Sequence, residues 1–187
     1  MVLGTRENII NALFRFAAKH PDDYNITIAD VASEAHISRQ AIYKKHYSTV
    51  ETIIEDIHEI ISSEFQNELD KFSENSGDEL FPFVIKNILP LIYRYRTWLK
   101  ILYTTSMDPH WLDFVEKRYS NWLSPHIKVN SNLPGVTQVF LRKYISKQII
   151  SLISLWISEE IPDPPEVFSK KFLKILEHPT TRLINTY

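Results

Sequence analysis

The chain has 187 residues, of which 44% are hydrophobic, and its 21 basic and 23 acidic side chains give a formal net charge of −2. It contains no cysteine, which excludes disulfide frameworks, thiolate zinc sites and a cysteine nucleophile. Its three glycines argue against a hairpin-rich β fold and against glycine-rich phosphate loops, so helices are expected. The length suits a small module joined to a larger one.

The hydropathy pattern contains neither a secretion signal nor a membrane span. The first residues lack a basic segment followed by an unbroken apolar run, so they do not resemble a signal peptide. No apolar stretch reaches the roughly 18 to 20 residues that a membrane span requires. We therefore expect a soluble cytoplasmic protein with no membrane partner.

The N-terminal segment predicts two helices. Apolar residues at helical spacing predict an amphipathic helix over residues 5–19, which ends before Pro21. Thr27, followed three residues later by Asp30, resembles a capping box. It opens a short second helix over residues 27–35 whose apolar residues share one face.

Two more helix starts follow closely. After a tight link, Ser38 can accept a hydrogen bond from the free amides of a third short helix over residues 39–45. Ser48 with Glu51 repeats the capping-box pattern and opens the longest periodic segment of the sequence, which predicts a helix over residues 48–73.

The rest of the sequence predicts five further helices, for an all-α fold of about nine helices. They cover residues 79–95, 98–104, 108–122, 136–158 and 165–177. Pro90 lacks a donor and should kink the first of these, while Asp108 followed by proline should cap the third. The helix over residues 136–158 is apolar around most of its circumference, which one core cannot cover.

Residues 27–47 predict two short helices joined by a tight turn, the layout of a DNA-binding helix-turn-helix. The first residues of the second short helix would then face base edges in the major groove. An arginine fork at Arg39 matches guanine, the amide of Gln40 matches adenine, and Ala41 can touch a thymine methyl group.

The segment "SRQAIYKKHY" is a local cationic surface on an acidic chain. It holds three Lys or Arg, one His and no acid, and residues 1–47 hold six Lys/Arg against five Asp/Glu, which leaves fifteen against eighteen in residues 48–187. Side chains at the end of the helix, together with free amides at helix starts, suit DNA phosphates. The predicted DNA contacts are Thr27, Ser38, Arg39, Gln40, Ala41, Tyr43, Lys44, Lys45, His46, Tyr47 and Ser48.

The segment "ITIADVASEAHISRQAIYKKHYSTVETII" resembles the signature of the TetR (tetracycline repressor) family of bacterial transcriptional regulators. The positions that carry the resemblance are Thr27, Val31, Ala32, Ser38, Arg39, Tyr43 and Tyr47. The family usually has glycine where His36 stands, and it has three residues from its tyrosine to the following aromatic, where this chain has four.

The resemblance implies a helix-turn-helix domain over residues 1–47 and a ligand-binding and dimerisation domain over residues 48–187. It implies a homodimer on a palindromic operator, paired through its last two long helices, and a cavity for a small apolar or aromatic effector. A repressor released by that effector is the function expected. The candidate cavity residues are Trp98, Tyr103, Trp111, Phe114 and Trp122. The candidate dimer contacts are Phe140, Tyr144, Ile149, Leu152, Ile153, Trp156, Phe168 and Phe172.

Two other functions remain open at the level of sequence: a regulator whose second domain binds a protein, and a helical carrier or enzyme. The seven histidines show no spacing of three or four residues, so no helical metal pair is expected. No nucleophile elbow, zinc-protease motif or phosphate loop occurs, so we expect neither a cofactor nor an enzyme.

Overall fold

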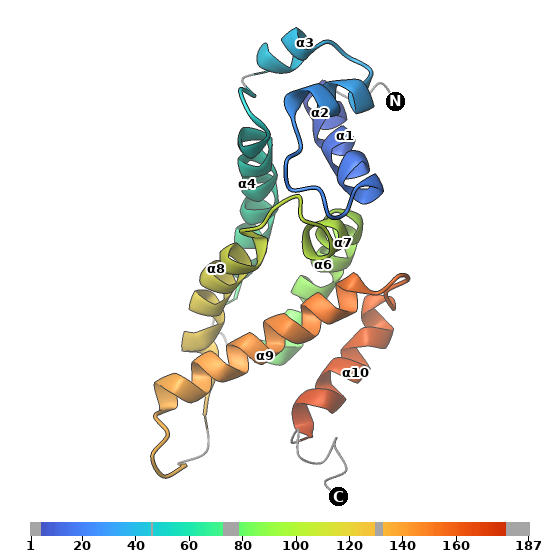
Figure 1. Cartoon of the computed structure of the whole chain (residues 1–187). Helices are drawn as coiled ribbons and strands as arrows, with labels where there is room; N and C mark the ends of the chain where they lie inside the picture. The colour runs from blue at the N-terminus through green and yellow to red at the C-terminus, as the bar shows by residue number, and fades with distance from the viewer. Residues whose placement is uncertain (1–4, 46, 73–78, 130–132, 179–187) are drawn as a thin grey trace, which may run out of the picture. The chain divides into compact units, whose positions relative to one another are not determined.

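Figure 1 shows the computed structural model, which describes residues 5–45, 47–72, 79–129 and 133–178. These residues form helices and their connections, and no strand occurs among them. The chain divides into two compact units. The first contains Met1–Asp70 and Thr97–Phe114, and the second contains Lys71–Arg96 and Val115–Tyr187. The predicted all-α fold is confirmed.

The helices follow the predicted order. They are α1 (Thr5–Lys19), α2 (Ile28–Ala35), α3 (Arg39–Tyr43), α4 (Val50–Leu69), α5 (Leu80–Phe83), the π-helix η2 (Val84–Ile88), α6 (Leu89–Arg94), α7 (Arg96–Thr104), α8 (Trp111–His126), α9 (Gln138–Ser158) and α10 (Pro165–Glu177). The predicted bounds of α1 and α10 are confirmed. None of the helices in the described ranges is long and apolar enough to cross a membrane.

The amphipathic pattern of α1 and α2 forms the core of the helix-turn-helix. Helix α1 buries Ile9 and Leu13 completely, and α2 buries Val31 in the same way. The two helices pack against each other, as Figure 1 shows in dark blue. Full burial of one such side chain contributes roughly 1.5–3 kcal/mol, so this contact supplies much of the stability of the segment.

Helix α2 begins and ends as its sequence dictates. The predicted capping box is confirmed, since Asp30 N donates to Thr27 Oγ1 at 3.3 Å and Thr27 N donates to Asp30 Oδ2 at 2.9 Å. The helix ends at His36, which has φ 55° and ψ 41° and is therefore left-handed. Ile37 N then donates to Ala32 O at 3.1 Å and completes the tight turn. The left-handed residue, His36, stands where the TetR pattern usually has glycine.

Helix α4 starts one residue later than predicted. Thr49, not Ser48, is the N-cap: Thr52 N donates to Thr49 Oγ1, and Thr49 N donates to Thr52 Oγ1, each at 3.4 Å. Both pairs have the capping spacing, so the local sequence does not choose between them. The buried face that begins at Val50 and continues through Ile53 fixes the start instead. The helix ends at Leu69 rather than at residue 73, which lies outside the described residues.

Pro90 divides the predicted helix 79–95 into α5, η2 and α6. Proline has no amide hydrogen for the carbonyl of residue 86, and the backbone widens into a π-turn ahead of it. Leu89 N accordingly donates to Val84 O, five residues back. A π-helical segment therefore precedes Pro90, and the kink stays a prediction.

The predicted cap at Asp108 is wrong. Helix α8 begins at Trp111, and Asp108 Oδ1 accepts a hydrogen bond from His110 N at 3.0 Å within the preceding turn. Asp108 is only 6% exposed, and its Oδ2 lies 2.6 Å from His58 Nε2. Its side chain is therefore used for a tertiary contact with α4.

His36 provides a test of the turn between α2 and α3. A left-handed conformation costs a residue with a Cβ atom roughly 1–2 kcal/mol, and glycine avoids this while losing more chain entropy on folding. We expect His36→Gly to raise the free energy of unfolding by about 0.5–1 kcal/mol in chemical denaturation. His36→Ala is the matched control and should not stabilise; equal behaviour of the two variants would contradict this explanation.

Candidate nucleic-acid interface

The first residues of α3 are exposed to solvent. Ser38 Oγ accepts a hydrogen bond from Ala41 N at 3.2 Å, which confirms the predicted cap. Ile42 is fully buried and anchors the helix, whereas Arg39 and Gln40 are exposed and Ala41 is half-buried. The cap and the anchor together direct the N-terminal side chains of α3 into solvent.

The end of α3 is a compact turn that carries two lysines. The helix ends at Tyr43, which is 50% exposed. Lys44 N donates to Gln40 O at 3.0 Å and Lys45 N donates to Ile42 O at 2.9 Å, so the turn is bonded to the helix. In the described part of the chain, no hydrogen bond or ion pair engages the side chains of Lys44 and Lys45.

Helix α2, which precedes this turn, is tied to α1 by polar side chains. Asn8 Nδ2 donates to Ala35 O at 3.0 Å. Glu34 accepts from Lys19 Nζ at 2.7 Å and from Arg15 Nε at 3.1 Å. Hydrogen bonds from Lys19 first, and then from Arg15, lower the pKa of Glu34. Because these groups are exposed, we expect each pair to contribute little, and the buried apolar contact to dominate.

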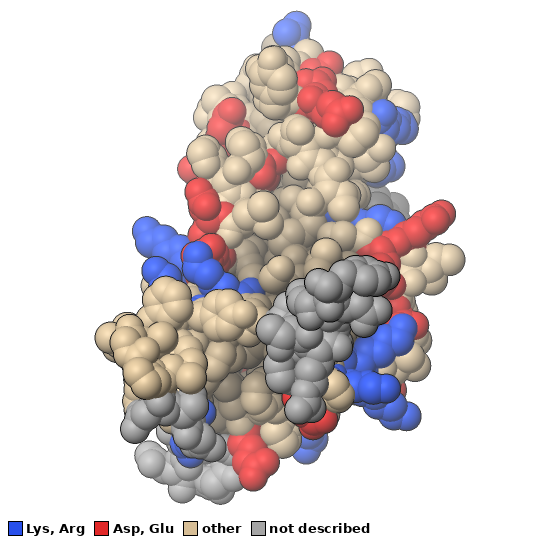
Figure 2. Space-filling view, turned by 60° about the horizontal axis from the view of Figure 1, so that its bottom comes forward, with Lys and Arg blue, Asp and Glu red and all other residues tan. Residues whose placement is uncertain are grey.

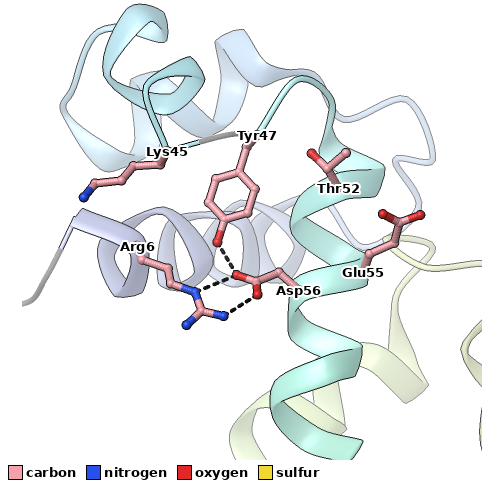
Figure 3. Close-up of a pocket in the computed structure, with 6 residues that line it drawn as sticks. All are labelled: Arg6, Lys45, Tyr47, Thr52, Glu55 and Asp56. Carbon is pink, nitrogen blue, oxygen red and sulfur yellow. Dashed lines mark hydrogen bonds and ion pairs between the residues drawn. The ribbon is translucent and has the colours of Figure 1, made fainter.

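A carboxylate on α4 connects three segments of the first unit (Figure 3). Arg6 Nε donates to Asp56 Oδ2 at 2.8 Å, and Arg6 Nη2 donates to Asp56 Oδ1. The hydroxyl of Tyr47 donates to Asp56 Oδ2. Asp56 therefore joins the first turn of α1, the link between α3 and α4, and α4 itself. We call these three residues the Asp56 network.

Burial and hydrogen bonding shift the titration of this network. Hydrogen bonds from Arg6, more than the one from Tyr47, lower the pKa of Asp56 against the opposing effect of burial. Burial, assisted by the hydrogen bond to Asp56, raises the pKa of Tyr47 to about 12. At neutral pH the network therefore holds an ionised carboxylate and a neutral phenol.

An open pocket of about 460 Å³ adjoins the network. It is lined by Arg6, Lys45, Tyr47, Thr52, Glu55 and Asp56. Two cationic and two acidic side chains line it, so its formal charge is balanced.

The structure bears on four of the predicted DNA contacts. The prediction for Tyr47 is corrected, because this residue is only 6% exposed and its hydroxyl is bonded to Asp56, so its side chain is part of the fold. His46 lies outside the described residues. Ser48 is exposed, and the amide of Thr27 is already occupied by Asp30.

Sequence reasoning missed Arg6 and Asp56. They are 50 residues apart, and neither belongs to a motif. The only local signal is a charged residue at position 56 within the apolar pattern of α4. Such a signal identifies a candidate for a buried charge pair, but it does not identify the partner.

The candidate cavity residues are distributed over both compact units. Trp98, Tyr103, Trp111 and Phe114 belong to the first unit and Trp122 to the second. Trp98 stacks on Phe14 with ring centroids 4.9 Å apart, while Phe114 stacks on His58 at 4.2 Å. Trp111 is 1% exposed and contacts the rings of Tyr103 and Phe114 at 5.7 and 5.6 Å.

In the second unit, Trp122 lies in a separate aromatic cluster. Its ring is 5.7 Å from that of Phe72 and 4.8 Å from that of His126. The role of the five aromatic residues in effector binding stays a prediction.

Four of the eight candidate dimer contacts are exposed or partly exposed, and four are buried. Phe140 and Tyr144 are exposed, and Leu152 and Ile153 are partly exposed. The other four are corrected, because each is at most 5% exposed within one chain: Ile149, Trp156, Phe168 and Phe172. Trp156 stacks on Phe168 with centroids 4.1 Å apart, so these rings join α9 to α10 within the chain. Within one chain these four side chains are therefore part of the core of the second unit.

Two short capped helices, a left-handed turn between them and exposed side chains at the start of the second define a helix-turn-helix. No protein-family model and no curated protein matches the sequence. Among solved structures, a TetR transcriptional regulator from Streptococcus agalactiae 2603V is similar, with a TM-score of 0.60 over 92% of this chain and 93% of that chain, at 19% sequence identity. The chain has the fold of that TetR regulator.

The Asp56 network predicts a specific response to acid. Because folding lowers the pKa of Asp56, the stability it contributes is complete above the unfolded value of about 3.8 and is lost as the pH falls through the folded value. We expect Asp56→Asn to lower the free energy of unfolding by about 1–2 kcal/mol at pH 6, after allowance for the exposure of Arg6.

Denaturation from pH 6 to pH 3 tests this expectation. The difference between the wild type and Asp56→Asn should shrink toward pH 3. A difference that stays constant over this range would show that the carboxylate is not held in its charged form.

Proposed function

We propose that the protein is a sequence-specific, DNA-binding transcriptional regulator that acts as a homodimer, and more specifically a repressor. The observation that carries this proposal is α3: a capped helix whose initial side chains, Arg39 and Gln40, are exposed while Ile42 anchors it. In a helix-turn-helix these initial positions contact base edges.

Each exposed group has a DNA partner of matching chemistry. The guanidinium of Arg39 pairs with O6 and N7 of guanine, and the amide of Gln40 pairs with N6 and N7 of adenine. Lys44 and Lys45, in the turn after α3, neutralise phosphates and release counterions. Arg39 and Gln40 would therefore provide sequence specificity, and the two lysines would provide attraction that does not depend on sequence.

Local charge is more relevant here than the charge of the chain. On the face that Figure 2 presents, acidic and basic side chains are interspersed with wide areas of other residues. Screening limits the reach of an exposed charge to roughly 8 Å at physiological salt, so the formal charge of −2 does not oppose DNA binding at α3.

Exposed apolar side chains on α9 support the homodimer. Val139, Phe140 and Leu155 are 74%, 63% and 66% exposed, and Tyr144 is 48% exposed. A second copy that covers these side chains removes apolar area from water at roughly 25 cal/mol per Å². Pairing places two copies of α3 in successive major grooves, about 34–36 Å apart, on a palindromic operator.

The candidate site for a small apolar or aromatic effector is the group of aromatic residues in the first unit. Tyr103, Trp111 and Phe114 pack ring against ring beside His58 on α4. An effector among them would act on the helix that follows the helix-turn-helix. Release from DNA needs a coupling of roughly 1–3 kcal/mol between effector and operator.

Gln40 tests base reading. Selection of duplexes from a random-sequence library should yield a palindromic operator for the wild type. Gln40→Ala should relax the preference at one base pair in each half-site, at a cost of roughly 1–3 kcal/mol in operator binding. An unchanged sequence preference would contradict the assignment of Gln40.

Lys44→Ala is the matched control, because it removes a phosphate contact and not a base contact. It should weaken binding to all duplexes alike. The slope of log K against log salt should become shallower by roughly 0.9 for each phosphate that the variant no longer neutralises.

The homodimer has a test of its own. The wild type should scatter light with a mass near twice the 22.0 kDa of one chain. Phe140→Glu should reduce the mass to that of one chain, because a carboxylate would be buried unpaired in the interface. Leu112→Glu, at a side chain on α8 that is also 63% exposed, is the matched control and should remain dimeric. A monomeric wild type at micromolar concentration contradicts this part of the proposal.

A further inference from the structure

We propose that the Tyr47 hydroxyl and Asp56 are positioning groups for the recognition helix: without touching DNA, they hold α3 in the orientation that reads bases. The inference rests on the proposed function, since it assigns a part in DNA recognition to residues whose side chains lie mostly within the fold. It concerns the hydrogen bond from Tyr47 to Asp56, which the sequence of the helix-turn-helix does not predict.

The first step is that α3 cannot fix its own orientation. It has five residues, fewer than an isolated helix needs for stability in water. Ile42 is its one buried side chain. A helix held at a single side chain can still rotate about that contact, so its two ends must supply the remaining constraints.

The start of α3 is constrained by the preceding turn. Ile37 N donates to Ala32 O, and Ser38 caps the helix. Asn8 on α1 in turn holds the carbonyl of Ala35 at 3.0 Å. This end is therefore fixed by a backbone hydrogen bond to α2, which the side chain of Asn8 in turn connects to α1.

The other end is constrained through Tyr47. The backbone amides of Lys44 and Lys45 are bonded to carbonyls of α3, so Lys45 moves with the helix. Tyr47 lies two residues further on, a distance that an extended chain spans in at most roughly 7 Å. The buried ring of Tyr47 thus holds the end of α3 by a short connection.

Asp56 determines where that ring lies. Its carboxylate accepts the Tyr47 hydroxyl and the guanidinium of Arg6 together, which fixes the carboxylate from two directions (Figure 3). Hydrogen bonds to a charged acceptor are roughly twice as strong as neutral ones. A Tyr47 ring that moved away would leave this partly buried carboxylate with less than its full set of donors, at a cost in free energy.

Tyr47→Phe removes only the hydroxyl and keeps the buried ring. We expect it to populate other orientations of α3, and the apparent affinity for the operator falls in proportion to the fraction still competent to bind. The expected result is a loss of roughly tenfold in affinity for the selected operator, with nonspecific duplex binding changed less than twofold. Asp56→Asn should change operator affinity in the same direction.

Two matched controls separate positioning from general effects. Tyr24→Phe deletes the same atom from a tyrosine that is 76% exposed, and it should leave operator affinity unchanged. Ile57→Val removes one methylene group from a fully buried residue next to Asp56 on α4. It should lower stability by roughly 0.5–1.5 kcal/mol without weakening operator binding in the fully folded protein.

The measurement is fluorescence anisotropy on the duplex selected by the wild type, at a temperature where circular dichroism shows every variant folded. A double variant, Tyr47→Phe with Asp56→Asn, should lose no more affinity than the weaker-binding single variant, since each single variant already removes the hydrogen bond between the Tyr47 hydroxyl and the Asp56 carboxylate. Operator binding of Tyr47→Phe within twofold of the wild type, or additive losses in the double variant, would overturn the inference. If the wild type itself selects no duplex, the proposed function fails instead.

Discussion

The first unit depends on one partly buried carboxylate. Asp56 accepts hydrogen bonds from Arg6 on α1 and from Tyr47 in the link between α3 and α4. An ionised carboxylate is costly to remove from water unless donors surround it, so the donors must come to it. That requirement brings together segments that the apolar core alone would leave free to shift.

The shortness of α3 makes this constraint necessary. In the proposed function, Arg39 and Gln40 contact bases, which requires that no group within the chain engages their side chains. A short helix without such internal contacts has little stability of its own. The stability must then come from its surroundings. Ile42 supplies an apolar anchor, and the capped turn and the Asp56 network hold the two ends.

Helix α9 shows a different division between core and surface. Its pattern predicts more apolar surface than one core can cover, and the structure divides that surface in two. Ile149 and Trp156 pack within the chain, whereas Phe140 and Leu155 remain exposed. All four side chains are apolar, so their chemistry does not distinguish them. The position of α10 does, because Phe168 occupies one side of Trp156.

The sequence by itself determined the features that local physics decides: the all-helical class, the bounds of α1, the cap at Thr27 and the exposed start of α3. The helix bounds and the cap depend on residues that are close together in the sequence, so their free energies are local. Only the tertiary structure decided that Thr49 rather than Ser48 caps α4, and that the side chain of Tyr47 is buried rather than exposed. Both outcomes depend on which distant groups share a core, and Asp56 is 50 residues away from Arg6.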